Sequence, residues 1–281
     1  MGLSSSYFAF QNFSVYDSVK RISDLGFSTV ELGAAHSFEK GISQTLRKIK
    51  KDFPKMNFTV HGMFPPLKEH HWFNLSLGIS KKNKKIFSDM FKAAELVEAM
   101  CVTVHPGYLS KAIFRNKMGM DCEKEGSPIS KEKALRGVCS AIDFAMQLSE
   151  KTGIGFGIEN VPQIVFKPAI YSAKDFQLLF AKFSKAGLLF DMGHALAETR
   201  LGEILSFKKK IIEMHVHYSR PKQGAPRRDE HLPLPSEEAI AFMKTIPQIK
   251  KIPLIFEHGT STSEQQILEE KKLLENFLKK I

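Results

Sequence analysis

The sequence predicts a single (β/α)8 barrel over residues 1–281. Three observations lead to this fold class: eight short apolar runs are typical of strands, amphipathic segments typical of helices lie between several of them, and the length is close to that of such a barrel, about 250 residues. Strands that alternate with helices indicate a parallel sheet joined by crossover helices. A doubly wound open sheet is the alternative, but no Gly-x-Gly-x-x-Gly follows the first run.

The predicted strands are rich in β-branched and aromatic residues. In chain order they cover residues 6–10, 28–33, 58–63, 101–107, 154–161, 187–195, 211–219 and 252–259. Helical periodicity is clearest over 17–26, 84–100, 131–153 and 173–187. Start and stop signals agree with it, since Ser130 precedes the third of these helices and Gly153 ends it. No linker divides the chain, and the longest irregular segment runs from about Leu109 to Pro128, where we expect a lid or a disordered loop.

Composition and cysteine content narrow the class of protein. Hydrophobic residues make up 43% and charged residues 25%, which is ordinary for a globular protein and excludes a disordered tail, a collagen-like fibre and a disulfide scaffold. No apolar run approaches the ~18 residues of a membrane span, and the N-terminus does not resemble a secretory signal. The three cysteines form no Cys-x-x-Cys pair, which indicates a reducing compartment. We therefore expect a cytoplasmic monomer without membrane contact.

The chain is basic, with a formal net charge of +11 and an isoelectric point of about 9.4. Such a balance favours anionic partners, although most of the lysines lie on predicted helices as ordinary solvated faces. One basic cluster differs, because it occupies a loop that contains proline and glycine and follows the seventh run. It consists of Arg220, Lys222, Arg227 and Arg228, and we expect it to bind phosphate.

Ionisable side chains interrupt the C-terminal ends of six apolar runs. These residues are His61, His105, Glu159, Asp191, His215 and Glu257, and nearby turns and loops add His194, Asp229 and His231. An unpaired ionisable group is costly to bury, so we expect partners or a metal there. The carboxyl ends of barrel strands converge on one face, where these nine residues would meet. Nitrogen and oxygen donors without thiolates suit Zn, Mn, Fe or Co, and nine donors exceed the needs of one ion.

Each residue alone has an ordinary structural interpretation, because a strand-end carboxylate often caps the next helix. Their recurrence at equivalent positions of the repeat favours a site. Three further histidines, His36, His70 and His71, lie in loop-like stretches and are interpreted as structural. His258 should face away from Glu257, whereas His217 shares a strand face with His215 and is a candidate substrate contact or substitute ligand.

Seven segments occur in the order found in the xylose isomerase-like barrel superfamily, which the chain resembles from Thr59 to Gly259. They are TVHGMF, VTVHPGY, GIENVP, FDMGHAL, EMHV, DEHLPL and IFEHG. The superfamily includes endonuclease IV, of the second family of abasic-site endonucleases, together with sugar isomerases and epimerases. The resemblance implies a metal-dependent enzyme built on a barrel.

The likeness to the endonuclease IV branch implies up to three zinc ions, with manganese as the alternative metal. The first ion would be held by His61, His105 and Glu159, the second by Glu159, Asp191, His215 and Glu257, and the third by His194, Asp229 and His231. Phe64 stands where that branch inserts an aromatic side chain into DNA, and Asn-Leu-Ser at 74–76 resembles its Asn-Leu-Ala.

Other segments depart from that branch and are more similar to sugar isomerase-like members. The segment EHG replaces the ending in which Thr-Pro follows the carboxylate, and no Gly-x-Gly follows DEHLPL. DMGHAL lacks the continuation typical of the endonucleases, and Tyr218 stands where most of the superfamily has aspartate. The resemblance is therefore firmer for the superfamily than for one activity.

Two activities follow, and the nine donors with the basic charge favour the first. This is hydrolysis of DNA at abasic sites, in which clustered metals activate a water that Glu159 orients and the basic loop holds phosphates. In the alternative, one ion held by the second set polarises a sugar carbonyl, Glu159 and Glu257 move the proton as base and acid, and the loop binds a sugar phosphate. A metal-binding barrel without catalysis is a third interpretation.

Overall fold

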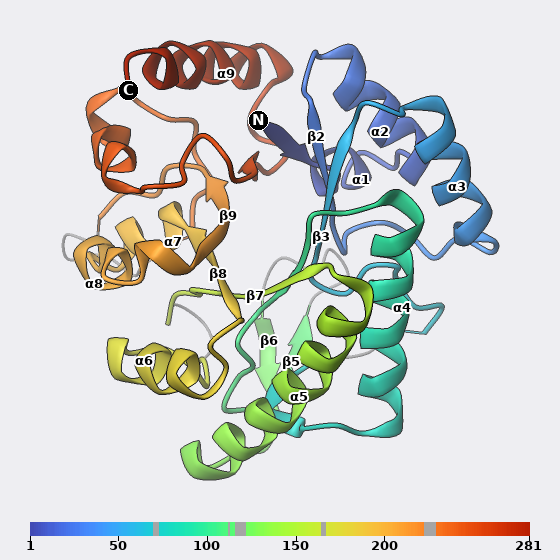
Figure 1. The fold of residues 1–281 in the computed structure, drawn as a ribbon, viewed down its shortest axis with the longest axis vertical. Coiled ribbons are helices and arrows are strands. Elements are labelled where there is room, and N and C mark those ends of the chain that lie inside the picture. Colours follow the sequence, from blue (N-terminus) through green and yellow to red (C-terminus); the bar gives the residue numbers. More distant parts are fainter. Residues whose placement is uncertain (70–72, 112, 116–121, 164–166, 222–228) are drawn as a thin grey trace.

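Eight parallel strands close into a barrel in the computed structural model, which describes residues 1–69, 73–111, 113–115, 122–163, 167–221 and 229–281 (Figure 1). The strands are β1 (Gly2–Ser4), β2 (Thr29–Leu32), β3 (Asn57–His61), β4 (Cys101–Val104), β7 (Gly155–Glu159), β8 (Gly187–Asp191), β9 (Ile211–Val216) and β10 (Leu254–Phe256). Their order around the barrel follows the chain, and β1 pairs with both β2 and β10. The predicted (β/α)8 barrel is confirmed.

Helices connect and surround the strands. They are α1 (Ser6–Ala9), α2 (Val15–Asp24), α3 (Ile42–Asp52), α4 (Lys81–Val97), α5 (Lys131–Thr152), α6 (Ala173–Lys182), α7 (Met192–Ala197), α8 (Leu201–Leu205) and α9 (Glu264–Lys279), with the 3-10 turns η1 (Leu75–Leu77), η2 (Lys208–Lys210) and η3 (Glu238–Thr245). The predicted start of α5 is confirmed, because the Ser130 hydroxyl accepts a hydrogen bond from the amide of Lys133. Gly153 ends the helix in the left-handed region, with φ of 75°.

The two faces of each strand have different partners. Phe156 of β7 packs on Phe87 and Phe91 of α4, and Phe190 of β8 packs on Phe242 of η3. Successive side chains alternate across a strand, so Glu159 and Asp191 point the other way, into the barrel. The apolar side chains that point outward thus pack against the helices, and polar side chains at the carboxyl ends of the strands point into the barrel.

The first predicted strand was wrong. The run at 6–10 forms α1 and its continuation, and the strand is the preceding segment Gly2–Ser4. A short apolar run can be a buried helix as well as a strand, and here Tyr7 and Phe8 are buried on one helical turn, with the Tyr7 hydroxyl donating to the carbonyl of Thr262 at 2.7 Å. Gly2 fits the strand because a Cβ there would lie 2.7 Å from the carbonyl oxygen of Thr29.

The segment from 109 to 128 is also more regular than expected. Two short antiparallel strands, β5 (Ile113–Arg115) and β6 (Cys122–Glu125), pair with each other outside the barrel. Strands of three and four residues are too short for their alternation to be read from sequence, which explains the wrong expectation of a structureless loop. Residues 112 and 116–121 lie outside the described part of the chain.

Within the described ranges, no helix combines the length and the apolar content that a bilayer crossing requires.

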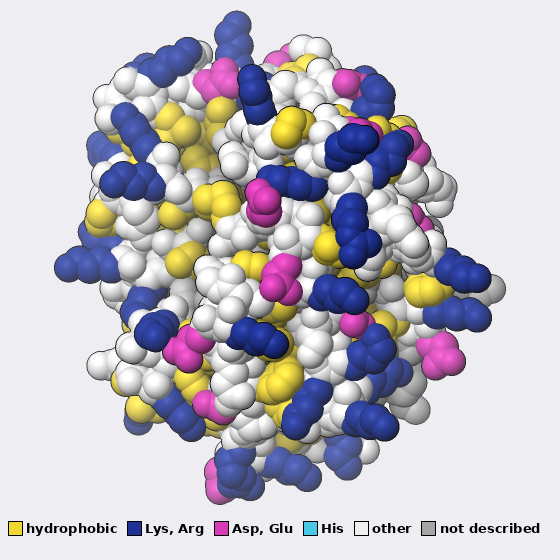
Figure 2. Space-filling view, turned by 45° about the vertical axis from the view of Figure 1, so that its right-hand side comes forward, with side chains coloured by type: hydrophobic (Ala, Val, Ile, Leu, Met, Phe, Trp, Pro, Cys, Tyr) yellow, Lys and Arg dark blue, Asp and Glu magenta, His cyan; other side chains and the backbone are white. Residues whose placement is uncertain are grey.

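The basic charge is dispersed over the face seen in Figure 2, where lysine and arginine side chains stand among acidic and apolar ones. Several lysines on the helices pair with carboxylates one turn away, as in Lys20–Asp24 and Lys85–Asp89. These exposed pairs are the solvated helix faces that the sequence predicts, and each contributes little to stability.

Two glycines in helices should respond in opposite ways to alanine. A Cβ at Gly137 of α5 would lie 2.2 Å from the carbonyl oxygen of Ser76, whereas a Cβ at Gly202 of α8 meets nothing within 4 Å. We expect Gly137→Ala to lower the free energy of unfolding by about 1–3 kcal/mol through overpacking. We expect Gly202→Ala to raise it by about 0.5 kcal/mol, because alanine is the better helix former. Urea denaturation measures both, and equal signs for the two variants would contradict this packing.

Candidate metal centre

The structure brings all nine predicted residues to the carboxyl end of the barrel, and Glu159 lies between two groups of them. One of its carboxylate oxygens is 3.2 Å from Nε2 of His61 and 3.2 Å from Nε2 of His105. The other is 3.0 Å from Nδ1 of His194. Glu159 itself is buried at the end of β7. His61, His105 and Glu159 therefore offer three donor atoms within 4.8 Å of one another.

The second predicted set closes beside the first. Nδ1 of His215 lies 3.0 Å from a carboxylate oxygen of Glu257 and 3.5 Å from one of Asp191. Glu159, Asp191 and His215 offer donor atoms within 4.8 Å of one another. These residues come from β7, β8, β9 and the residue after β10, which are consecutive in the barrel. We call Glu159, Asp191, His215 and Glu257 the inner set.

The third predicted set comes from α7, which follows β8, and from the loop after β9. A single carboxylate oxygen of Asp229 is 3.0 Å from Nε2 of His194 and 2.8 Å from Nε2 of His231. His217 joins them, with its ring stacked on that of His231 at a centroid distance of 4.0 Å. We call His194, His217, Asp229 and His231 the outer set, and their four donor atoms lie within 4.8 Å of one another.

Histidines of the cluster also have a second, supporting partner. Nδ1 of His61 lies 3.0 Å from the Thr103 hydroxyl, whose proton is donated to Glu213, so His61 is the donor in that contact. Nδ1 of His105 contacts the Tyr108 hydroxyl at 2.8 Å, and Nδ1 of His231 lies 2.7 Å from the carbonyl oxygen of Glu257. In each case the other ring nitrogen faces a carboxylate. This is how metal-binding histidines are usually oriented.

The donors fit a divalent metal. Three buried atoms of the cluster have no well-aligned hydrogen bond: Oε2 of Glu159, Nδ1 of His215 and Nδ1 of His217. A buried polar atom without a partner is costly, and the first two, which face other donor atoms of the cluster, would be satisfied as ligands of a cation. The cluster supplies imidazole nitrogens and carboxylate oxygens only, which is the chemistry preferred by zinc, manganese and related ions.

Charge compensation shifts the protonation of the cluster. Burial by itself would raise the pKa of Glu159, but His105, His194 and His61 outweigh it and hold that pKa well below its usual range. In the same way His215 lowers the pKa of Glu257 to about 2 against the effect of burial. Burial would lower the pKa of His61, but the carboxylate of Glu159, 3.2 Å from Nε2, raises it to about 9. Without a metal, carboxylates of the cluster therefore face protonated imidazoles such as His61 and His215, whereas burial lowers the pKa of His217.

Two buried carboxyl groups were missed by the sequence argument. Glu31 on β2 contacts Nε2 of His215 at 2.7 Å, and Glu213 on β9 accepts hydrogen bonds from Thr103 and Cys101. Burial raises the pKa of Glu213 to about 7. Both residues interrupt an apolar run, as six of the nine do, so the same signal could have found them. They were overlooked because they stand one or more residues before the end of the run.

The predicted phosphate and DNA contacts receive little support from the described residues. Phe64 is fully buried and packs against His36, so its ring offers no surface for insertion into DNA, contrary to expectation. An apolar ring at this turn is better accommodated in the core than in solvent. Arg220 is exposed and forms an ion pair with Glu230 at 2.6 Å. The rest of the basic loop, Lys222, Arg227 and Arg228, lies outside the described residues, as do His70 and His71.

His217 and His258 are both buried, on opposite sides of the barrel wall. Nε2 of His217 is 3.0 Å from a carboxylate oxygen of Asp191, so this histidine is part of the cluster and not a free substrate contact. His258 turns away from the cluster, as predicted, and contacts Glu270 of α9 at 2.5 Å.

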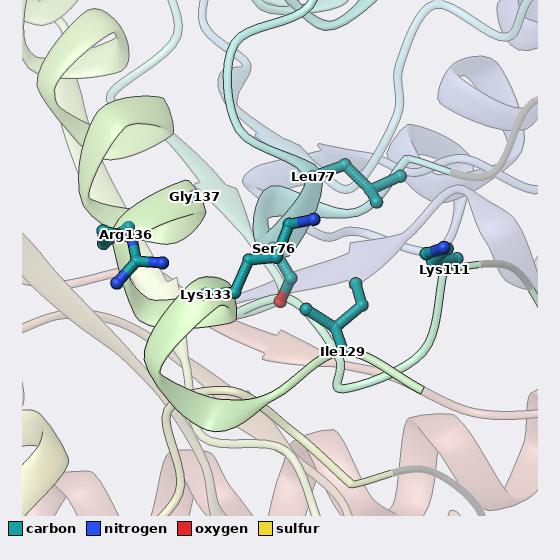
Figure 3. A pocket seen from close by; sticks show the side chains of 7 residues that line it. All are labelled: Ser76, Leu77, Lys111, Ile129, Lys133, Arg136 and Gly137. Carbon is teal, nitrogen blue, oxygen red and sulfur yellow. The ribbon is translucent and has the colours of Figure 1, made fainter. Parts of the chain in front are cut away.

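A cavity of about 490 Å³ lies away from this cluster, between η1 and the start of α5 (Figure 3). It is lined by Ser76, Leu77, Lys111, Ile129, Lys133, Arg136 and Gly137. None of the nine predicted ligands lines it. The candidate site therefore rests on the side-chain cluster at the barrel mouth.

Comparisons with known proteins agree with this architecture. The family model described as "Xylose isomerase-like TIM barrel" matches residues 19–277. Among the curated proteins, none matches the chain in sequence.

Solved structures of sugar epimerases share the fold over nearly the whole chain. A D-tagatose 3-epimerase-like protein is 17% identical with a TM-score of 0.69, covering 99% of this chain and 97% of its own. The 3-keto-D-glucoside 4-epimerase YcjR from E. coli is 13% identical with a TM-score of 0.66, covering 98% of each chain. A D-psicose 3-epimerase from Clostridium cellulolyticum H10 is 14% identical with a TM-score of 0.64, covering 99% and 98%.

Metal binding should stabilise the protein more strongly as the pH rises. The folded pKa of His61, about 9, exceeds its ordinary value of 6.5, so its ion pair stabilises the metal-free fold fully below pH 6.5 and is lost as the pH rises to about 9. A metal replaces those protons, and its contribution grows over the same interval. Urea denaturation across this interval, with chelator or with added Zn²⁺ or Mn²⁺, measures the difference. A metal contribution that is constant with pH would contradict this assignment of the cluster.

Proposed function

The chain belongs to the xylose isomerase-like TIM barrel family. We propose that it is a metal-dependent isomerase or epimerase of a sugar or a sugar phosphate. The proposal rests on the inner set, which brings three carboxylates and one imidazole close together at the barrel mouth. Barrel enzymes have their active sites on this face.

The two glutamates of the inner set are placed to act on one substrate from different sides. Glu159 ends β7 and Glu257 follows β10, and β8 and β9 separate these two strands in the barrel. The pKa values of both side chains are lowered, so both are bases near neutral pH. One glutamate would remove the proton from the carbon beside a carbonyl, leaving an enediolate. The other glutamate, after taking a proton from solvent, would deliver it to the opposite face of the same carbon and complete an epimerisation. Return of the proton to the neighbouring carbon would complete an isomerisation.

A divalent metal would be held by the inner set. Bound there, it would supply Lewis acidity toward the substrate carbonyl and its neighbouring hydroxyl oxygen. His215 and Asp191 would serve as ligands without a role in proton transfer. Nitrogen and oxygen donors such as these favour zinc or manganese over softer ions.

The structural neighbours support sugar chemistry over the hydrolysis that the sequence favoured. The solved structures described above are those of epimerases or of an epimerase-like protein, and they match the fold over nearly its full length. Two residues that we expected to contact DNA are less available for it in the structure, because Phe64 is buried and Arg220 is paired with Glu230. The lysines on the face in Figure 2 are interspersed with acidic groups.

Phosphodiester hydrolysis remains a second candidate because one observation favours it. The donors outside the inner set are arranged as two further groups, His61 and His105 around Glu159, and the outer set around Asp229. A sugar isomerase needs one metal of this kind, whereas a hydrolase that clamps both oxygens of a phosphodiester uses two or more. Abasic DNA would be its substrate.

Loss of either glutamate should abolish proton transfer. We expect Glu159→Gln and Glu257→Gln each to lower kcat by about 10²–10⁴-fold, because an amide cannot act as the base. Screening sugars and sugar phosphates in D2O by NMR measures the effect directly, since turnover places solvent deuterium on the reacting carbon. Glu264→Gln, on the surface of α9, is the control and should exchange at the rate of the unaltered protein. Turnover without deuterium incorporation would contradict the proposed chemistry.

The two candidate functions differ in their need for His105, which belongs to the group around Glu159 and not to the inner set. For sugar chemistry we expect His105→Asn to retain activity within about tenfold. For hydrolysis it would remove a ligand of a clustered metal, costing several kcal/mol of transition-state stabilisation, or about 10²-fold or more in rate. Metal analysis and nicking of abasic duplex DNA complete the test. Two or three ions per chain with rapid nicking would overturn the sugar proposal.

A further inference from the structure

The imidazole of His215 is held from behind by a buried carboxylate of another strand. Oε2 of Glu31 lies 2.7 Å from Nε2 of His215, and the two residues are 184 positions apart in the chain. Both are fully buried. Their strands, β2 and β9, are separated in the barrel by β1 and β10, so this contact crosses the barrel interior. The seven segments that carry the resemblance do not include Glu31.

This contact determines which nitrogen of His215 faces the inner set. A neutral imidazole has one N–H, and a carboxylate oxygen can only accept a hydrogen bond. When a metal is bound at Nδ1 the ring is neutral, and its one proton sits on Nε2, between the ring and Glu31. Nδ1 faces carboxylate oxygens of Glu257 and Asp191, at 3.0 and 3.5 Å, as it would if these atoms shared a cation. A lone pair that faces carboxylates is favourable only if a cation lies between them.

We propose that Glu31 is a positioning residue for the metal of the inner set. It fixes the tautomer and the ring orientation of His215 and increases the basicity of Nδ1, in the manner of a carboxylate–histidine–metal relay. This inference rests on the proposed function, because it assumes that the inner set binds a divalent metal. It adds a residue from the first half of the chain, whose side chain lies on the opposite side of His215 from the metal ligands.

Two other roles for Glu31 must be distinguished from positioning. A buried ion pair can be purely structural, in which case its loss affects folding and not metal affinity. Glu31 can also be a direct ligand, because its carboxylate, His61 and His215 offer donor atoms within 4.8 Å of one another.

The chain contains a matched control for the structural role. Oε2 of Glu270 contacts Nε2 of His258 at 2.5 Å, and both side chains are buried. This is the same carboxylate–imidazole pair, but His258 faces α9 and not the cluster. Replacement of Glu270 by glutamine breaks an equivalent pair outside the site.

The experiment is a titration of metal-free protein with Mn²⁺, followed by the electron paramagnetic resonance signal of the free ion. We expect Glu31→Gln to weaken the binding of the inner metal by about 10–100-fold. Glu270→Gln should bind Mn²⁺ within about threefold of the unaltered protein, although both variants should lose stability in urea. Affinity lost in Glu31→Gln alone supports positioning, while equal affinity in all three proteins, or equal losses in the two variants, overturns it.

Two further outcomes complete the test. If one full equivalent of metal disappears in Glu31→Gln, Glu31 is a ligand and the positioning role is wrong. If the unaltered protein binds no metal, the proposed function fails, which is a different result from a failure of Glu31. Should Glu31→Gln not fold, ¹⁵N-histidine NMR of the unaltered protein loaded with Zn²⁺ decides, because a proton on Nε2 of His215 supports the proposal and a proton on Nδ1 overturns it.

Discussion

Glu159 is buried at the end of β7, and its carboxylate is stable there because three imidazoles approach it at 3.0 to 3.2 Å. An uncompensated buried charge would destabilise the fold by several kcal/mol. Removing one partner from a buried ion pair typically lowers the free energy of unfolding by about 3–5 kcal/mol. The three histidines come from β3, from the residue after β4 and from the helix after β8. The positions of these strands relative to β7 are therefore a condition for burying the charge.

The closed parallel sheet meets this condition with the alternation of side chains along each strand. Phe156 and Phe190 face the helices, so Glu159 and Asp191 face the interior. Because all eight strands run in the same direction, their carboxyl ends meet at one mouth, and residues far apart in sequence become neighbours. Packing of the helical layer and assembly of the site thus depend on the same alternation of side chains along the strands.

Much of this arrangement could be predicted from the sequence, for reasons that also explain the failures. Seven of the predicted strands overlap the observed ones, because long alternations of apolar runs and amphipathic helices leave few topologies. Six of the nine donors were found because they interrupt the ends of apolar runs, and the other three because they lie on the adjoining turns and loops. The first strand was wrong because Tyr7 and Phe8 are buried on a helical turn, and apolarity alone does not distinguish the two states. Phe64 was misplaced because sequence position does not reveal burial of a turn residue. Glu31 was missed because it stands before the end of its apolar run, and only the fold shows its contact with His215.

The donors are distributed unevenly along the chain. All four members of the inner set, and all four of the outer set, follow residue 150 and come from β7 to β10 and their loops. The first half of the barrel, from β1 to β4, contributes His61, His105 and Glu31, which contacts His215. The loops that follow β1 and β2 carry none of the nine donors, yet they border the same mouth. Substitutions in these two loops can therefore change which molecules enter the mouth without replacing any of the nine donors.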